Sequence, residues 1–496
     1  MFAKNTFWNL IYQLTAVVAG FLIPRAIIGV YGSEVNGLVT SLTQFIGYFA
    51  LVEAGISGAA TFALYKPLAQ GDWESANIVA SASRVFYKKS GAVFLLLLVC
   101  LSVVYPVFVS ASYLSPLEIA FLTFLLGAKV VVDFFALSKY RVFLTADQKN
   151  WLIQVASTVY TLLNTVIIIG FAYLRVPVVL VYFVALLAVF ARSLILFIYT
   201  RRNYPELNCK VDFTGYELPQ RWDALFLQIL GAVQSGAPVI LATILCGSMA
   251  DVSVLAVYLL VSNGLQMIPN ILGTGMQALF GRQLVEGDYS ALRLSYRLYR
   301  ALVYGVSAVA CGCAFSLILS FVDLYASGFN DANYHNALLG FLIVLNVFLY
   351  HGKSSQGLLV IAAGMYRQTR FQTSLQALLI IVFGIPLTIK FGIVGTIAAS
   401  CVSNLYRVID LLIFEPIAIT KDSLLNSFKS FGLYALQTVL VVLPGCFISG
   451  FASSWLSWII VALCLVVWGA IVVVLTLAVF DKDSCRSIFK RLGRVG

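Results

Sequence analysis

Charged side chains are scarce in this sequence of 496 residues. Asp, Glu, Lys and Arg together make up 11% of it, whereas soluble domains carry about 25% charged residues. Hydrophobic residues make up 61%, and the mean hydropathy is +0.95. This composition excludes an ordinary soluble domain and indicates a protein whose solvent is the lipid bilayer.

Familiar catalytic and metal-binding motifs are missing as well. The 9 cysteines include no C-x-x-C pair, and the 2 histidines fit no familiar metal-ligand spacing, so we expect neither redox nor metal chemistry. The sequence contains no G-x-x-x-x-G-K-[ST] motif, which excludes a phosphate-binding loop for ATP. We therefore expect no enzyme, no bound cofactor and no nucleic-acid partner.

Long apolar stretches fill most of the chain instead. Apolar runs of ~18 or more residues mark membrane-spanning helices, and fourteen such runs occur. Their approximate ranges are 7–30, 38–65, 91–109, 119–143, 151–173, 177–200, 224–246, 252–280, 301–322, 336–363, 374–390, 393–415, 431–451 and 457–480. The predicted fold class is an all-α polytopic membrane protein with about 14 transmembrane helices.

Lys and Arg are distributed very unevenly between the two sides of the predicted membrane. With a cytoplasmic N-terminus, 24 of the 32 basic residues fall in cytoplasmic segments, and the outer loops hold only Arg175 and Lys390. The positive-inside rule therefore predicts that both termini are cytoplasmic. The remaining bases lie within spans: Arg25, Lys129, Lys139, Arg192, Lys353 and Arg407.

The second half of the sequence resembles the first at an offset of 215 to 217 residues. The segment PLAQGDWESA (67–76) aligns with QLVEGDYSAL (283–292) through a shared Gly-Asp-aromatic turn. We predict two parallel six-helix lobes around a central cavity, an architecture of alternating-access transporters. The predicted parts are an N-terminal lobe (1–200), a cytoplasmic connector (201–223), a C-terminal lobe (224–415), and two extra C-terminal helices with a basic cytoplasmic tail (416–496).

Bases inside the membrane call for an explanation, because an ionisable residue at the centre of a spanning helix costs about 2.5–3.5 kcal/mol. Lys129 and Arg407 fall near the predicted midplane, Lys353 lies toward the inner side and Arg25 toward the outer side. We predict that these four bases bind an anion in the cavity. For Arg25, Lys139 and Arg192, snorkelling to the lipid headgroups is the alternative.

Three acids share the membrane with these bases. Asp133 follows Lys129 by four residues and Asp410 follows Arg407 by three, so each pair shares a helix face and could neutralise itself. Glu53 has no such neighbour, so it requires a partner on another helix or is a protonatable site. These acids are the predicted sites for coupling to an H⁺ or Na⁺ gradient. The excess of bases favours an anionic substrate.

The first ninety residues or so resemble a known family. The matching positions lie in the first three helical segments: Pro24 and Arg25, the Asn36-Gly37-Leu38 string, Glu53 with Gly55, and LYKPL from Leu64 to Leu68. They resemble bacterial oligosaccharide flippases of the polysaccharide transporter family. These Wzx-type proteins belong to the multidrug/oligosaccharidyl-lipid/polysaccharide exporter superfamily.

The resemblance implies a flippase in the bacterial cytoplasmic (inner) membrane. Its substrate would be a polyprenyl-diphosphate-linked oligosaccharide, moved from the cytoplasmic to the outer leaflet for O-antigen, capsule or exopolysaccharide. The polymerase and glycosyltransferases of that pathway would be its partners. A lipid II flippase is the alternative, and a cation-coupled multidrug exporter or a non-transporting membrane scaffold is less favoured.

Overall fold

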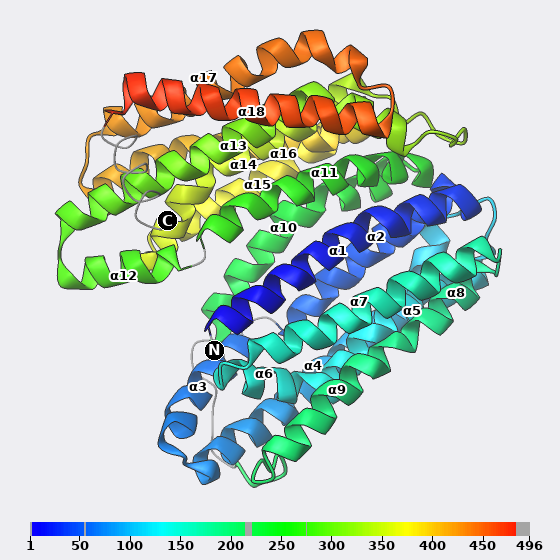
Figure 1. The fold of residues 1–496 in the computed structure, drawn as a ribbon. Helices are drawn as coiled ribbons and strands as arrows, with labels where there is room; N and C mark the ends of the chain where they lie inside the picture. Colours follow the sequence, from blue (N-terminus) through cyan, green and yellow to red (C-terminus); the bar gives the residue numbers. More distant parts are fainter. Residues whose placement is uncertain (1, 54–55, 214–220, 274, 483–496) are drawn as a thin grey trace. The chain divides into compact units, whose positions relative to one another are not determined.

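The computed structural model describes residues 2–53, 56–213, 221–273 and 275–482, and nearly all of them are helical (Figure 1). Helices make up 87% of the structure, with no strand in the described ranges. In those ranges, 14 helical segments are long and apolar enough to cross a membrane. The predicted all-α class and number of spans are therefore confirmed. Residues 214–220 of the predicted connector and 483–496 of the predicted basic tail lie outside the described residues.

The chain divides into two compact units, Met1–Ser253 and Val254–Gly496. The division into lobes at 1–200 and 224–415 stays a prediction. The elements of the first unit are α1 (Phe2–Tyr31), α2 (Ser33–Phe49), the 3₁₀-helix η1 (Ala50–Glu53), α3 (Ile56–Gln70), α4 (Trp73–Phe108), α5 (Pro116–Val132), the π-helix η2 (Asp133–Leu137), α6 (Ser138–Ala146), α7 (Asn150–Tyr173), α8 (Val178–Leu186), α9 (Ala188–Asn203) and α10 (Arg221–Leu245).

Helix α11 (Met249–Gly273) begins in the first unit and continues into the second. The second unit contains α12 (Met276–Glu286), α13 (Tyr289–Tyr325), α14 (Ala337–Ala362), α15 (Arg370–Phe391), α16 (Ile393–Glu415), the π-helix η3 (Pro416–Thr420), α17 (Leu424–Ile448), the 3₁₀-helix η4 (Ser449–Phe451) and α18 (Trp455–Phe480). Helix α16 packs against α14 and α15, while α17 and α18 pack against α13.

Small residues and buried hydroxyl groups hold the helices of the first unit together. Helix α2 approaches the start of α11 so closely that a side chain at Gly37 would overlap the Met249 carbonyl. The Ser41 hydroxyl accepts hydrogen bonds from Tyr105 on α4 and Thr243 on α10, each at 2.8 Å. Lipid tails are as apolar as the side chains, so close backbone approach and hydrogen bonds between helices replace the hydrophobic effect as the association force.

Two helices are much longer than a bilayer is thick. Helix α4 has 36 residues and α13 has 37, which corresponds to about 54–56 Å at ~1.5 Å per residue, against a hydrocarbon core of about 30 Å. Both helices begin with polar, basic sequence and end in apolar sequence. Their first turns therefore extend beyond the hydrocarbon on the side that the positive-inside rule assigns to the cytoplasm.

The Gly-Asp-aromatic turn has the same conformation before both long helices. Gly71 (φ +68°) and Gly287 (φ +72°) adopt the left-handed conformation. The next residue caps the helix: the Asp72 carboxylate accepts from the Ser75 amide at 3.0 Å, and the Asp288 carboxylate accepts from the Ala291 amide at 2.9 Å. These hydrogen bonds hold the pKa of both carboxyl groups below its ordinary value.

Four predicted spans are interrupted rather than continuous, among them the span at 177–200, which divides into α8 and α9. The span at 38–65 divides into α2, η1 and α3, and the span at 252–280 divides into α11 and α12. The span at 119–143 passes through the π-helix η2 into the more polar α6. The ends of these predicted spans were placed by apolar composition alone. Composition does not indicate where an α-helix changes to a π-helix.

We predict that replacing either turn glycine lowers stability. Gly71→Ala and Gly287→Ala should each cost about 1–2 kcal/mol, because a Cβ atom is disfavoured in the left-handed region. The midpoint of thermal unfolding in detergent measures this loss. Gly231→Ala in α10 is the matched control, since no heavy atom lies within 4 Å of the added Cβ and alanine favours helix. Equal midpoints for all three variants would contradict the role of the turns.

Candidate functional site

Two clusters of ionisable residues lie within the membrane-spanning helices, one in each unit. The first cluster lies on α5, η2 and α9, and the second on α14 and α16. Each cluster contains a lysine and an Arg–Asp ion pair. The clusters are described separately below.

In the first unit, Asp133 pairs with Arg192 rather than with Lys129. The Arg192 guanidinium, on α9, forms an ion pair with the Asp133 carboxylate at the start of η2. The same guanidinium lies 5.2 Å from the centre of the Tyr160 ring. Partners from two other helical segments, η2 and α7, therefore hold Arg192 in the bundle, which argues against the alternative that its charge simply snorkels to the headgroups.

The π-helix at Asp133 has a local cause in the sequence. A π-helix adds one residue to a turn and leaves the normal hydrogen-bond ladder incomplete. The Asp133 carbonyl is satisfied by the backbone amide of Ser138 and by the Ser138 hydroxyl at 2.9 Å. A serine five residues after the acid thus stabilises the wider turn.

Lys129 lies on the last turn of α5, partly buried. The charges that act on its ammonium group are those of Asp133 and Arg192. Within the described residues, no carboxylate approaches it within 4.0 Å, and it forms no hydrogen bond that meets ordinary geometry. The predicted neutralisation of Lys129 by Asp133 along one helix face is therefore replaced by the Arg192–Asp133 pair.

Glu53 has a partner on another helix, which is one of the two outcomes that its sequence context allowed. Its carboxylate, at the end of η1, forms an ion pair with Arg141 on α6. The Ser90 hydroxyl on α4 donates to the neighbouring Val52 carbonyl at 3.4 Å. Three segments far apart in the sequence therefore meet where α2 ends.

In the second unit, Arg407 and Asp410 pair along one face of α16, as their spacing predicted. Their side chains are 2.5 Å apart, and both are mostly buried. The Arg407 charge acts on Lys353, which lies on α14. The Lys353 ammonium lies 5.5 Å from the centre of the Tyr350 ring, and no carboxylate of the described chain pairs with it.

The two clusters share one pattern. Lys129 lies on the fourth span and Lys353 on the tenth, while Arg192 lies on the sixth and Arg407 on the twelfth. With six spans in each predicted repeat, these are the fourth and sixth helices of each lobe. The position of the acid differs between the two clusters. Asp133 lies on the same span as the lysine, whereas Asp410 lies on the same span as the arginine. The shared feature is therefore the pair of cations.

The remaining site predictions lie outside these clusters or outside the described part. Arg25 lies on α1 directly after Pro24 and is partly buried. The prediction for Lys139 concerns a side chain outside the described residues. The assignment of the predicted bases to anion binding and of Glu53, Asp133 and Asp410 to ion coupling remains a prediction.

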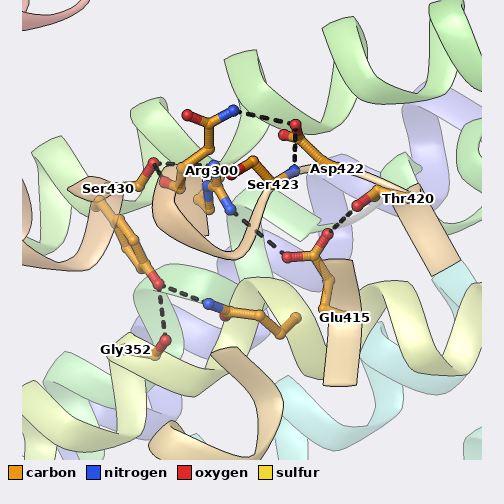
Figure 2. A network of polar contacts seen from close by, with 10 residues as sticks. Arg300, Gly352, Glu415, Thr420, Asp422, Ser423 and Ser430 are labelled. Carbon is orange, nitrogen blue, oxygen red and sulfur yellow. Dashed lines mark hydrogen bonds and ion pairs between the residues drawn. The ribbon is translucent and has the colours of Figure 1, made fainter. Parts of the chain in front are cut away.

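Sequence reasoning missed a buried ion pair in the second unit (Figure 2). Arg300 on α13 lies between Glu415, at the end of α16, and Ser430 on α17. The Arg300 Nη1 atom is 3.6 Å from Glu415 Oε2, and Nη2 donates to Ser430 Oγ at 2.9 Å. The other carboxylate oxygen of Glu415 accepts from the Thr420 hydroxyl at 2.6 Å. This network connects α13, α16, η3 and α17.

A second missed feature is a chain of buried amides beside Arg407. The Gln376 side chain donates to Asn404 at 3.1 Å, and Asn404 donates to Asn346 at 2.8 Å. These residues come from α15, α16 and α14. Their partners lie one or two spans apart in the sequence, so no local spacing could have indicated the contact.

Comparison with known proteins supports the fold. No protein-family profile and no curated protein sequence matches the chain. It is similar in structure to an inward-facing multidrug resistance MATE family transporter of the MOP superfamily, with a TM-score of 0.68, 15% identity, and 82% of this chain and 95% of that chain covered. It is also similar to the lipid II flippase MurJ in an inward closed conformation, with a TM-score of 0.67, 12% identity, and 96% and 99% covered.

A further similar structure is a MOP superfamily transporter from Pyrococcus furiosus. Its TM-score is 0.50 and its identity 16%, and the match covers 85% of this chain and 96% of that one. That protein is described as having a binding pocket of reverse polarity, which suggests a different function. The chain thus has the fold of MOP superfamily transporters.

We predict that Asp133→Asn destabilises the first unit. The change leaves Lys129 and Arg192 without a nearby negative charge, and breaking a buried ion pair costs about 3–5 kcal/mol. Because the Asp133 and Arg192 side chains are 24% and 18% exposed, we expect a loss of about 3 kcal/mol, the lower end of that range. The thermal midpoint in detergent measures it.

Two further variants make this test specific. Asp251→Asn changes an exposed acid on the first turn of α11 and should leave the midpoint unchanged. Adding Lys129→Gln to Asp133→Asn should restore part of the loss, because it removes one of the two unneutralised cations. A wild-type midpoint for Asp133→Asn alone would contradict a stabilising role for the ion pair.

Proposed function

We propose that the protein is an alternating-access flippase for a lipid-linked anionic oligosaccharide. The substrate is a polyprenyl-diphosphate-linked repeat unit, which moves from the cytoplasmic to the outer leaflet of a bacterial inner membrane with both protein termini in the cytoplasm. The observation that carries the proposal is that Lys129 and Lys353, both within membrane-spanning helices, have no carboxylate partner among the described residues.

Charge balance leads from that observation to an anionic substrate. Each predicted coupling acid is paired with an arginine: Glu53 with Arg141, Asp133 with Arg192, and Asp410 with Arg407. Lys129 and Lys353 have no carboxylate partner among the described residues. A charge at the centre of a spanning helix costs about 2.5–3.5 kcal/mol of insertion free energy. The described chain supplies no carboxylate to offset this cost for the two lysines, and an anionic ligand would do so.

A diphosphate diester suits such a pair of lysines. Each of its phosphates carries a negative charge, and an ammonium group binds phosphate through three donors. In the proposed cycle, the diphosphate and glycan occupy the central cavity that the sequence predicts, while the lipid tail stays in the bilayer. Arg25 and Arg407 complete the proposed anion path.

The extent of the structural matches supports a flippase over a drug exporter. The lipid II flippase match covers 96% of this chain, whereas the multidrug transporter matches cover 82–87%. The excess of cations at membrane depth also suits an anion better than an organic cation. An ion gradient would supply the energy if H⁺ or Na⁺ competes with an arginine for Glu53, Asp133 or Asp410.

We predict that Lys129→Gln with Lys353→Gln abolishes transport. Each lost charge-assisted contact to phosphate costs about 1.5–3 kcal/mol, which is at least about tenfold in affinity per lysine. The measurement is surface glycan in a host strain whose own copy of the gene is deleted, with protein abundance in the membrane measured in parallel.

The controls separate charge from structure. Lys129→Arg with Lys353→Arg keeps both charges and should retain much of the glycan. Lys66→Gln with Lys88→Gln removes two exposed lysines of the first unit and should retain all of it. Full glycan in the Lys129→Gln/Lys353→Gln strain, at normal protein abundance, would refute the proposed anion site.

A lipid II flippase is the second function to test, because that match covers nearly the whole of both chains. Lipid II also carries a diphosphate, so the lysines do not distinguish the two substrates. We expect that expression of this protein does not rescue a strain depleted of its own lipid II flippase, and that it restores surface glycan in its own deletion strain. Rescue of growth would assign lipid II instead.

A further inference from the structure

The second unit contains a basic pocket that the proposed transport function does not use. It has a volume of about 780 Å³ and lies between the first turns of α13 and α17 and the last turn of α18. In the predicted topology, this end of the bundle faces the cytoplasm. The basic side chains that line it are Arg293, Arg297, Arg300 and Lys429.

Two of the four bases form ion pairs with acids, and the other two form none among the described residues. Arg300 pairs with the buried Glu415, and Arg297 forms an ion pair with Asp481 at the end of α18. Arg293 donates to the Lys421 carbonyl at 3.3 Å, a neutral acceptor. Lys429 is exposed and pairs with no carboxylate among the described residues. Arg293 and Lys429 therefore leave the pocket positive.

The other lining acid is engaged by its own helix. The Asp422 carboxylate accepts from the Ser423 amide at 2.7 Å and from the Asn426 side chain at 3.0 Å. Ser423 is the N-cap of α17, so these contacts hold Asp422 beside the start of that helix. With Asp422 and Asp481 counted, the lining still has four bases and two acids.

A rigid polar network forms one wall of the pocket (Figure 2). Ser430 Oγ accepts from Arg300 and donates to the Asn426 carbonyl at 2.8 Å. Arg300 is only 6% exposed, so α13 and α17 are fixed to each other at this point. The pocket is accordingly formed by packed secondary structure and not by a loop.

The lining changes from polar to apolar along α17. Asn426, Lys429, Leu433 and Leu436 all line the pocket from one face of that helix. Leu436 lies seven residues beyond Lys429, about 10 Å deeper at ~1.5 Å per residue. Leu294 of α13 and Phe480 of α18 add exposed apolar surface, at 52% and 66% exposure.

We propose that this pocket binds an anionic phospholipid from the cytoplasmic leaflet. Arg293 and Lys429 contact the headgroup phosphate, and an acyl chain lies along Leu433 and Leu436. The bases lie at headgroup depth and the leucines one to two turns deeper. This arrangement matches a phospholipid, whose charged phosphate lies at headgroup depth and whose acyl chains lie below it. A free phosphate would use only the basic end of the pocket.

Bound lipid would strengthen the packing of α17 and α18 on α13. Those two helices lie outside the predicted repeat, and α13 is the helix of the repeat that contacts both. A headgroup held by Arg293 and Lys429 would connect α13 to α17 at the ends that the predicted topology places in the cytoplasm. The site is independent of the proposed anion path at Lys129 and Lys353.

Native mass spectrometry of the full-length protein tests this proposal. The probes are phosphatidylglycerol, which is anionic, and phosphatidylcholine, which is zwitterionic, with equal acyl chains. We expect tighter binding of phosphatidylglycerol, and a loss of about thirtyfold in Arg293→Gln/Lys429→Gln, because each basic side chain near an anionic surface contributes about fivefold.

Matched variants and a competitor make the outcome decisive. Arg282→Gln/Arg367→Gln removes the same charge from exposed positions of the second unit and should bind phosphatidylglycerol like the wild type, as should Arg293→Lys/Lys429→Arg. Added phosphatidylglycerol should raise the thermal midpoint of delipidated wild type and not that of Arg293→Gln/Lys429→Gln. Equal affinity for both lipids, unchanged binding in Arg293→Gln/Lys429→Gln, or full displacement by equimolar inorganic phosphate would overturn the proposal.

Discussion

The free-energy cost of an ionisable group in hydrocarbon is the constraint on which this structure depends. The chain meets it with arginines: Glu53, Asp133 and Glu415 each pair with an arginine from another helical segment, and Asp410 with one on its own helix. A guanidinium suits this task because it is planar, weakly hydrated and rich in donors, whereas an ammonium group is compact and strongly hydrated. Since these four acids pair with arginines, Lys129 and Lys353 have no carboxylate partner among the described residues.

The π-helices show how backbone and charge are adjusted together. Helix η2 begins at Asp133 and η3 directly follows Glu415, so each π-helix lies beside an ion-paired acid. An extra residue in a turn rotates the side chains that follow it. It also leaves a backbone carbonyl that needs a further hydrogen-bond donor, and lipid hydrocarbon contains none. Ser138 provides a hydroxyl donor to the Asp133 carbonyl, and Thr420 provides one to the Glu415 carboxylate. Ser138 therefore satisfies the carbonyl that the wider turn leaves at Asp133, while Thr420 holds one oxygen of the Glu415 carboxylate beside η3.

Predictions from the sequence succeeded where the signal was local or compositional. Hydropathy identified the fourteen spans, although the runs predicted at 91–109 and 301–322 begin well after the starts of α4 and α13. Ion-pair partners were harder to predict, because helical spacing assigned Asp133 to Lys129, whereas its partner Arg192 lies 59 residues away and the helix widens at Asp133. Arg300 was assigned to a cytoplasmic segment because the apolar run began after it. Asp288 caps the start of α13, and that helix contains Arg300. The capping residue in the sequence could therefore have placed Arg300 inside the helix.

The comparison of the two clusters bears on why the lysines are there. Both units contain an Arg–Asp ion pair, and if neutralising a charge were the only requirement, we would expect the acid to lie at the same place of the predicted repeat in each. Instead the acid lies on the fourth span in the first unit and on the twelfth span in the second, while the lysine and arginine keep the fourth and sixth places of the predicted repeat. What the two units share is therefore two cations on these helices, one of them unpaired. Internal neutralisation does not require an unpaired lysine, whereas the proposed anionic ligand would give each lysine a partner in the membrane.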